Sequence, residues 1–270
     1  TTLPAGSAAT AAAPAPVDAD VAALATAMQI DRIIDVMRQE GLDYARTLQD
    51  DMFPGAPNRG WIAEVEAIYD LDRMRQEFSV ALSAALAGNP GLEAMTGFMG
   101  SAFGHRVIGL ELAARKALLD PDAEDAARVA WLKLEDEDGT RARQIQRFVE
   151  VNDLLDSNVT GAMNSNIAFY RGLMAAAPAD MAMTEEDILA SVSEQQAQIE
   201  AETADWLYPY LTLAYQPLTD AELDDYLAFS ESAPGQDMNR ALFAAFAVMF
   251  DRLSHDLGLA AGRRMQGQDI

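Results

Sequence analysis

The sequence of 270 residues contains no cysteine. Disulfides, zinc ribbons, iron–sulfur clusters and thiol nucleophiles are therefore excluded, because each of them needs a cysteine sulfur. A chain without thiols suits an oxidising compartment such as the bacterial periplasm, although its composition alone does not fix the compartment.

Long apolar runs and clustered positive charge are missing as well. We find no stretch of about 18 apolar residues, the length that a membrane-spanning helix requires. The formal net charge is −24, whereas binding to nucleic acid phosphates or anionic lipid needs clustered lysine and arginine. We therefore expect no nucleic-acid partner and no transmembrane segment.

Lysine and arginine are absent between Arg171 and Arg240, and this stretch is rich in aspartate and glutamate. A solvated surface that opposes aggregation is the simpler interpretation of such an imbalance. The alternative is a face for an unidentified protein partner, for which a basic surface would be complementary.

The first residues read TTLPAGSAATAAAPAP and carry no charged side chain. An Ala/Pro/Ser/Thr segment of this kind cannot form a packed element. We interpret residues 1–16 as a flexible leader of the mature protein after removal of a signal peptide, and we expect a periplasmic or secreted protein. A truncated start would look the same.

Apolar residues recur every three or four positions along most of the chain, which is typical of amphipathic helices. Alternating β-branched segments bounded by turns are absent, so the sequence predicts an all-α fold. We expect a short helix at residues 18–28, longer helical patterns at 30–52, 58–88, 140–174 and 185–214, and a strong apolar stripe from Met238 to Leu257.

Several residues mark expected ends or breaks of these helices. Asn89 followed by Pro90 is a favourable helix start. A Ser/Asn-rich stretch at 156–166 and a proline at Pro209 predict an interruption and a bend, respectively. Two pairs have the three-residue spacing of a capping box: Thr184 with Asp187, and Thr219 with Glu222.

A segment of the chain occurs twice at an offset of 131 residues, at 92–114 and at 223–245. The part shared most clearly is the pattern F-x-x-S-A-x-G. We interpret it as a joint between two helices, in which the serine caps the outgoing helix and the glycine allows close approach. The joint residues are Phe98, Ser101 and Gly104 in the first copy, and Phe229, Ser232 and Gly235 in the second.

The repeat predicts two tandem, pseudo-duplicated helical-bundle domains. The charged sequence EDEDG provides the boundary between them. The expected organisation is a leader at 1–16, a first helical domain at 17–134, an acidic linker at 135–139, a second helical domain at 140–262 and a loose tail at 263–270.

Candidate metal sites fail on their spacing. In a calcium loop with Gly139 at the sixth position, Leu134 and Ile145 would occupy the first and twelfth positions, which require acidic ligands. The residues three before His105 and His255 are not glutamate, so the Glu-x-x-His pairs of di-iron bundles are absent.

His255 also lies close in sequence to Asp251 and Asp256, a set that could bind one metal ion weakly. A surface histidine held by a carboxylate is the simpler interpretation. The G-x-S-x-G and G-x-x-x-x-G-K motifs are absent. We therefore predict no catalytic residue, no metal site, no cofactor and no enzymatic activity.

The joint, preceded by an acidic helix start and followed by an amphipathic helix, resembles the bacterial domain of unknown function family 2059. The better match is at 218–246, and the segment from Met28 to Ala114 is similar to the same family. In the first copy, Phe103 replaces the usual proline. The resemblance implies exported, all-helical proteins, and it supplies no catalytic residues.

These observations favour a non-enzymatic protein-interaction module. A first alternative is a carrier of small apolar ligands, with a groove between helices lined by methionine and phenylalanine. A second, less favoured alternative is a metal-dependent hydrolase that uses His255 with two carboxylates.

Overall fold

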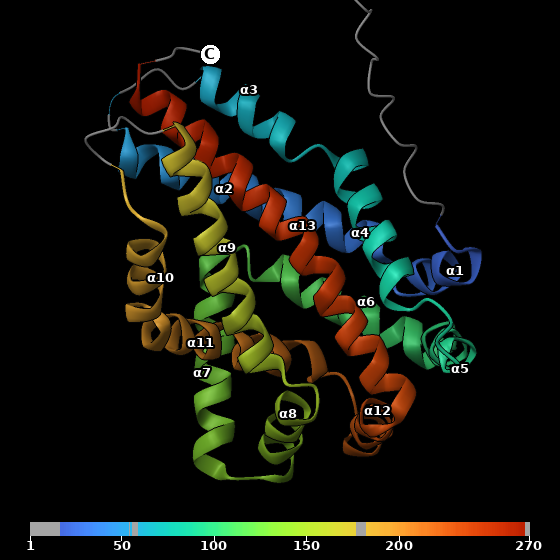
Figure 1. Cartoon of the computed structure of the whole chain (residues 1–270). Coiled ribbons are helices and arrows are strands. Elements are labelled where there is room, and N and C mark those ends of the chain that lie inside the picture. Colours follow the sequence, from blue (N-terminus) through green and yellow to red (C-terminus); the bar gives the residue numbers. More distant parts are fainter. Residues whose placement is uncertain (1–16, 54, 56–58, 177–181, 268–270) are drawn as a thin grey trace, which may run out of the picture.

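The computed structural model describes residues 17–53, 55, 59–176 and 182–267, and it is helical throughout these ranges, with no strand (Figure 1). The predicted all-α fold class is confirmed. The predicted leader at 1–16 lies outside the described residues. The helices are α1 (Ala19–Ala27), α2 (Ile30–Met52), α3 (Arg59–Ile68), α4 (Leu71–Ala85), α5 (Leu92–Met99), α6 (Ala102–Ala117), α7 (Pro121–Glu137), α8 (Thr140–Val151), α9 (Leu154–Ala176), α10 (Glu185–Glu194), α11 (Gln196–Tyr215), α12 (Asp220–Glu231) and α13 (Ala233–Met265).

The two F-x-x-S-A-x-G segments have the same local geometry. Ser101 and Ser232 stand at the N-caps of α6 and α13, with φ/ψ of −69°/161° and −70°/157°. The Ser101 hydroxyl donates to the Phe98 carbonyl at 2.7 Å and accepts from the Gly104 N–H at 3.0 Å. The same two bonds of Ser232, to Phe229 and Gly235, measure 2.6 and 3.2 Å.

The glycine of each joint is required by close approach of the backbone. A Cβ atom at Gly104 would lie 2.3 Å from the Phe98 carbonyl oxygen, and one at Gly235 would lie 2.1 Å from that of Phe229. Each side chain other than hydrogen would therefore force the incoming and outgoing helices apart.

The two joints contact each other. The rings of Phe98 and Phe229 stack with their centroids 3.8 Å apart and their planes 1° apart. On one side of the stack, Arg106 of α6 binds Glu222 at the start of α12. On the other side, Asn89 before α5 donates to Asp237 of α13 at 3.0 Å. Arg106 and Asp237 are 131 residues apart, which is the offset of the repeat.

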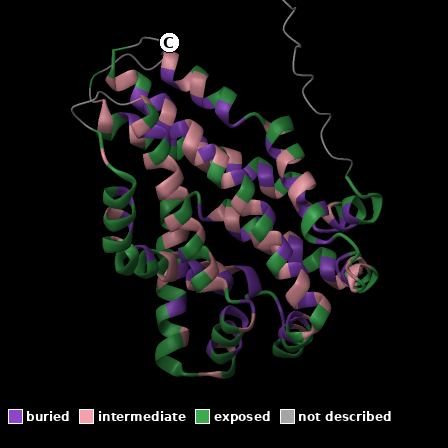
Figure 2. Cartoon of the chain, viewed as in Figure 1, coloured by how far each residue is buried: buried purple, intermediate pink, exposed green. Residues whose placement is uncertain are grey.

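Helices α6 and α13 each contact the other half, and α13 packs most extensively on α9 of its own half. Helix α6 packs on α11, whereas α13 packs on α4. Within the halves, α1 packs on α5 and α8 packs on α12. Most buried apolar residues of both halves, together with Trp131 of α7, belong to one continuous core, whereas Ile188 and Val192 of α10 lie outside it (Figure 2). The packing thus crosses the predicted boundary between residues 17–134 and 140–262.

Both predicted flexible segments near the helix ends are shorter than expected. Residues 135–137 of the predicted linker form the last turn of α7, and the turn itself consists of Asp138, with φ of 43°, and Gly139. Residues 263–265 of the predicted tail continue α13, where Arg264 lies over the ring of Phe53.

The helix breaks inside the predicted segments fall at other positions than expected. The pattern at 58–88 is divided at Asp70, whose carboxylate caps α4 by accepting from the Arg73 N–H. The break expected within 156–166 lies at Asp153, which has a φ of 50°, and α9 continues through the Ser/Asn-rich stretch.

Three further boundaries concern the second half and the first joint. The pattern at 185–214 divides at Gln195, whereas Pro209 lies inside α11. Gly91, not Asn89, stands at the N-cap of α5, and the Asn89 side chain accepts from the Gly91 N–H. Both capping boxes, at Thr184 and Thr219, are confirmed.

Helices α9 and α13 pack at backbone contact distance (Figure 1). A Cβ atom at Gly172 would lie 2.0 Å from the carbonyl oxygen of His255, and one at Gly258 would lie 2.0 Å from that of Phe169. One turn further, a Cβ atom at Gly262 would lie 2.5 Å from the Leu173 carbonyl oxygen. Glycine at these positions lets the two longest helices of the second half cross closely.

We expect Gly258→Ala to destabilise the protein by about 2 to 3 kcal/mol, because the added methyl group must separate α9 from α13. The control is Gly161→Ala on α9, where an added Cβ meets nothing within 4 Å. That variant should gain about 0.5 to 1 kcal/mol from reduced backbone entropy of the unfolded chain. Urea unfolding measures both changes, and equal effects would contradict the close crossing.

Candidate functional site

Helix α7 connects the two halves and lies at the edge of the molecule. Asp120 caps its first turn by accepting from the Asp122 N–H, and Pro121 occupies the first helical position. The helix packs on α11 and α8. Its buried residues are Ala127 and Trp131, and the Trp131 ring stacks on Tyr208 with centroids 4.6 Å apart.

The outer face of α7 carries an exposed apolar centre. Val129 is 67% exposed and Leu132 is 55% exposed, and Figure 2 shows this side of α7 in the exposed colour. The central sequence AARVAWLKL, residues 126–134, is apolar on most sides of the helix. A helix of that composition is typical of a position covered on every face.

Acidic residues flank this apolar centre on the same face. Spacings of three and four residues place side chains on one stripe of a helix. The stripe, which we call the α7 outer stripe, is exposed along its whole length and consists of Asp122, Asp125, Val129, Leu132 and Asp136.

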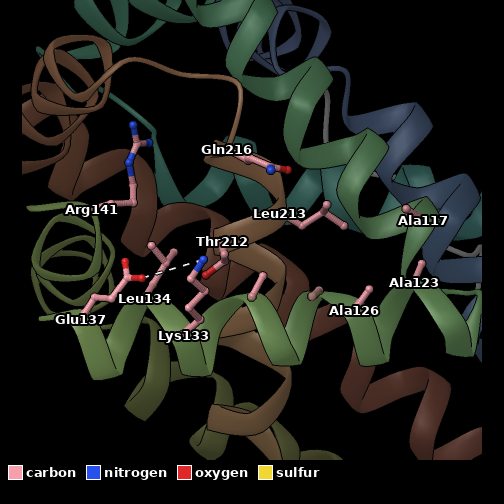
Figure 3. Close-up of a pocket in the computed structure, with 12 residues that line it drawn as sticks. Ala117, Ala123, Ala126, Lys133, Leu134, Glu137, Arg141, Thr212, Leu213 and Gln216 are labelled. Carbon is pink, nitrogen blue, oxygen red and sulfur yellow. Dashed lines mark ion pairs between the residues drawn. The ribbon is translucent and has the colours of Figure 1, made fainter. Parts of the chain in front are cut away.

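A half-open groove of about 580 Å³ lies on the other flank of α7, towards α11 (Figure 3). Alanines form much of its apolar lining. Its lining residues are Ala117, Ala123, Ala126, Ala127, Ala130, Lys133, Leu134, Glu137, Arg141, Thr212, Leu213 and Gln216.

The charged side chains of the groove differ in how firmly they are held by other protein groups. Arg141 donates to the backbone oxygens of Tyr215 and Leu218 at 2.9 and 2.6 Å and to Asp220 at 2.8 Å. Its guanidinium group is therefore structural. The Lys133 ammonium lies 3.9 Å from the Glu137 carboxylate, and the lysine side chain is 76% exposed. Such an exposed pair contributes little to stability.

A buried hydroxyl belongs to the same groove. Thr212 is only 6% exposed, and its Oγ1 finds no hydrogen-bond partner among the described residues. Thr212 and Lys133 both line this groove (Figure 3). An unsatisfied buried hydroxyl costs about 1 to 3 kcal/mol.

A separate carboxylate is held between two tyrosines where α6, α11 and α12 meet. Glu111 of α6 accepts hydrogen bonds from the hydroxyls of Tyr215 at 2.8 Å and Tyr226 at 3.2 Å. Burial raises the pKa of Glu111 to about 7, against the lowering effect of these two hydrogen bonds. Glu111 therefore changes charge near neutral pH and joins α6 to α11 and α12.

The residues predicted from the sequence occupy other places. The six joint residues form the two helix corners and line neither of the two main hollows. His105 is exposed on α6, and His255 lies 3.5 Å from Asp256 on α13. Within the described ranges no group of three histidine or acidic side chains could hold a metal ion.

The groove also differs from the one expected for an apolar-ligand carrier. Neither the groove beside α7 nor the second hollow, between α1 and α5, is lined by methionine or phenylalanine. Core residues such as Met74, Met95 and Phe78 are fully buried instead. The carrier with a groove lined by methionine and phenylalanine therefore stays a prediction.

Sequence reasoning missed the α7 outer stripe, the Thr212 hydroxyl and Glu111. The stripe had a readable signal, because residues 126–134 are apolar on most sides. Glu111 had a weaker one, since it falls four residues after Val107 and three before Ala114, on the apolar side of α6. No sequence signal marked the Thr212 hydroxyl, because its surroundings are formed by helices that are distant in the sequence.

Comparison of the chain with protein-family models, with curated proteins and with solved structures finds no match. The resemblance to the domain of unknown function family 2059 therefore stays a prediction. None of the helices in the described part of the chain has the length and apolar character needed to cross a bilayer.

We expect Glu111→Gln to remove a pH dependence of stability. Glu111 keeps its proton in the folded state up to a pKa of about 7, whereas the unfolded chain releases it at its ordinary pKa of 4.5. The stability of the wild type therefore falls as the pH rises between these values. Because the side chain is partly exposed, we expect a change of about 1 to 2 kcal/mol.

Unfolding by urea at pH 5 and at pH 8 measures this difference. Glutamine retains an oxygen that accepts from both tyrosines, so Glu111→Gln should gain stability relative to the wild type as the pH rises. Glu93→Gln on the exposed side of α5 is the control. A constant difference between Glu111→Gln and the wild type at both pH values would contradict the assignment.

Proposed function

We propose that the protein is a non-enzymatic protein-interaction module, and that the α7 outer stripe receives an amphipathic helix of its partner. The exposure of Val129 and Leu132 at the centre of an edge helix is the observation that carries the proposal. Exposed apolar side chains grouped within a polar rim are typical of interaction surfaces.

The spacing of the stripe explains why the partner segment is a helix. Steps of three and four residues generate the seam along which two helices pack side by side. Val129 and Leu132 would insert between apolar side chains of the partner, as anchors do in a helix-in-groove complex. Their burial would remove apolar surface from water.

The acidic residues at both ends of the stripe favour basic residues at both ends of the partner helix. Asp122 and Asp125 precede the apolar centre, and Asp136 follows it. Exposed Glu202 and Asp205 of α11 lie on the neighbouring helix, and Asp205 pairs with Arg128 of α7 at 3.2 Å. A helix with an apolar centre and lysine or arginine at both ends is complementary to this arrangement.

We also propose that the protein is exported and that its two halves arose by duplication. The composition of residues 1–16 supports export to the periplasm or secretion. The resemblance to the domain of unknown function family 2059 supports the same setting. The matching joints and the exchange of α6 and α13 support descent of the two halves from one copied unit.

The double variant Val129→Asp/Leu132→Asp tests the docking surface. A synthetic amphipathic helix with a leucine centre and lysine ends should bind the wild type, and the same helix with glutamate ends should not. We expect at least about tenfold weaker binding to the double variant by calorimetry, since two apolar anchors become like-charged with the rim. Val248→Asp on α13 is the control, a valine that is also more than half exposed (52%, against 67% for Val129).

The results distinguish a basic partner helix from a second copy of this chain and from the absence of specific binding at the stripe. Equal binding of both peptides, or equal binding to the double variant, would overturn the proposal. Self-association of the wild type that the double variant abolishes would assign the stripe to a second copy of this chain, which contradicts the basic partner. Circular dichroism of each variant confirms that the helices remain folded.

A further inference from the structure

The groove between α7 and α11 has an alanine-rich part and a polar part, and the Thr212 hydroxyl belongs to the polar part. Threonine in a helix usually bonds its hydroxyl to the carbonyl four residues earlier. At Thr212 the hydroxyl makes no such bond, and the oxygen is also shielded from solvent. Lys133, on the facing helix α7, lines the same groove (Figure 3).

We propose that this groove binds a free aliphatic carboxylate, with its alkyl chain over the alanines and its head between Lys133 and Thr212. A carboxylate only accepts hydrogen bonds, and the Lys133 ammonium and the Thr212 hydroxyl both donate. The Thr212 oxygen is shielded from solvent, so the side chains around it must move for the head group to reach it. The ligand thereby satisfies a buried group that the protein leaves unsatisfied.

The size and lining of the groove indicate which kind of alkyl chain the ligand has. Its volume of about 580 Å³ lies in the range of small-molecule sites. Ala123, Ala126 and Ala130 present methyl groups on one side of α7, and Leu213 faces them from α11. Small side chains leave room for an unbranched chain and offer no polar group along it.

The other charged residues of the groove, Arg141 and Glu137, favour a ligand with one carboxylate group. Arg141 is occupied by two backbone oxygens and Asp220, so it is not the site of the head. Glu137 lies 3.9 Å from Lys133 and is the group with which the ligand competes. A second negative charge on the ligand would be repelled by Glu137.

Calorimetric titration with decanoate and with 1-decanol tests the proposal. We expect the wild type to bind decanoate at least tenfold more tightly than 1-decanol. Lys133→Met and Thr212→Val should each reduce the affinity for decanoate towards that for 1-decanol. The chain contains one other lysine, Lys116, which does not line the groove, and Lys116→Met is the matched control that should bind like the wild type.

Thermal unfolding distinguishes loss of a binding group from loss of the fold. Valine has the shape of threonine without the hydroxyl, so Thr212→Val should unfold at a temperature equal to or above that of the wild type while binding decanoate more weakly. A lower unfolding temperature with unchanged decanoate affinity would show a purely structural hydroxyl and overturn the proposal.

Two further outcomes would also overturn it. Absence of decanoate binding removes the site, and equal affinity for 1-decanol removes the role of the head group. Ala130→Phe, which fills the groove, should abolish binding of both probes.

This test is independent of the proposed partner helix, because Val129 and Leu132 do not line the groove. The Val129→Asp/Leu132→Asp variant should therefore bind decanoate normally.

Discussion

The stack of Phe98 on Phe229 is the contact on which the rest of the arrangement depends, because it joins the two corners at which α5 turns into α6 and α12 turns into α13. From these corners each outgoing helix enters the opposite half, α6 against α11 and α13 against α4. Aromatic burial and close backbone packing at Gly104 and Gly235 fix the directions of both helices. The consequence is one continuous core built from two similar sets of helices.

The same exchange explains why α7 lies at the edge of the molecule. Helices α1 to α6 precede α7 and helices α8 to α13 follow it, so α7 is the connection between the two halves. It packs through a narrow stripe around Ala127 and Trp131, and its remaining apolar residues face the solvent or the alanine-lined groove. Apart from Ala127 and the core residue Trp131, the apolar side chains of this connecting helix are therefore available for binding on its two free flanks.

Local sequence signals predicted the local structure well, whereas packing between distant residues could not be predicted. The capping boxes at Thr184 and Thr219 are read from four consecutive residues, and the all-α class follows from periodicity. The break at Asp70 was missed because the apolar pattern runs through it without interruption. The setting of Glu111 and Thr212 arises from helices about one hundred residues apart, which leaves no local trace in the sequence.

A double-mutant cycle on Phe98 and Phe229 tests the meeting of the two joints most directly. The free energies of unfolding of Phe98→Ala, Phe229→Ala and the double variant are compared with that of the wild type by urea denaturation. Contact between the rings predicts that the two losses are non-additive, with a coupling of about 0.5 to 1.5 kcal/mol. Additive losses, within about 0.3 kcal/mol, would contradict the face-to-face joints and the exchange of helices built on them.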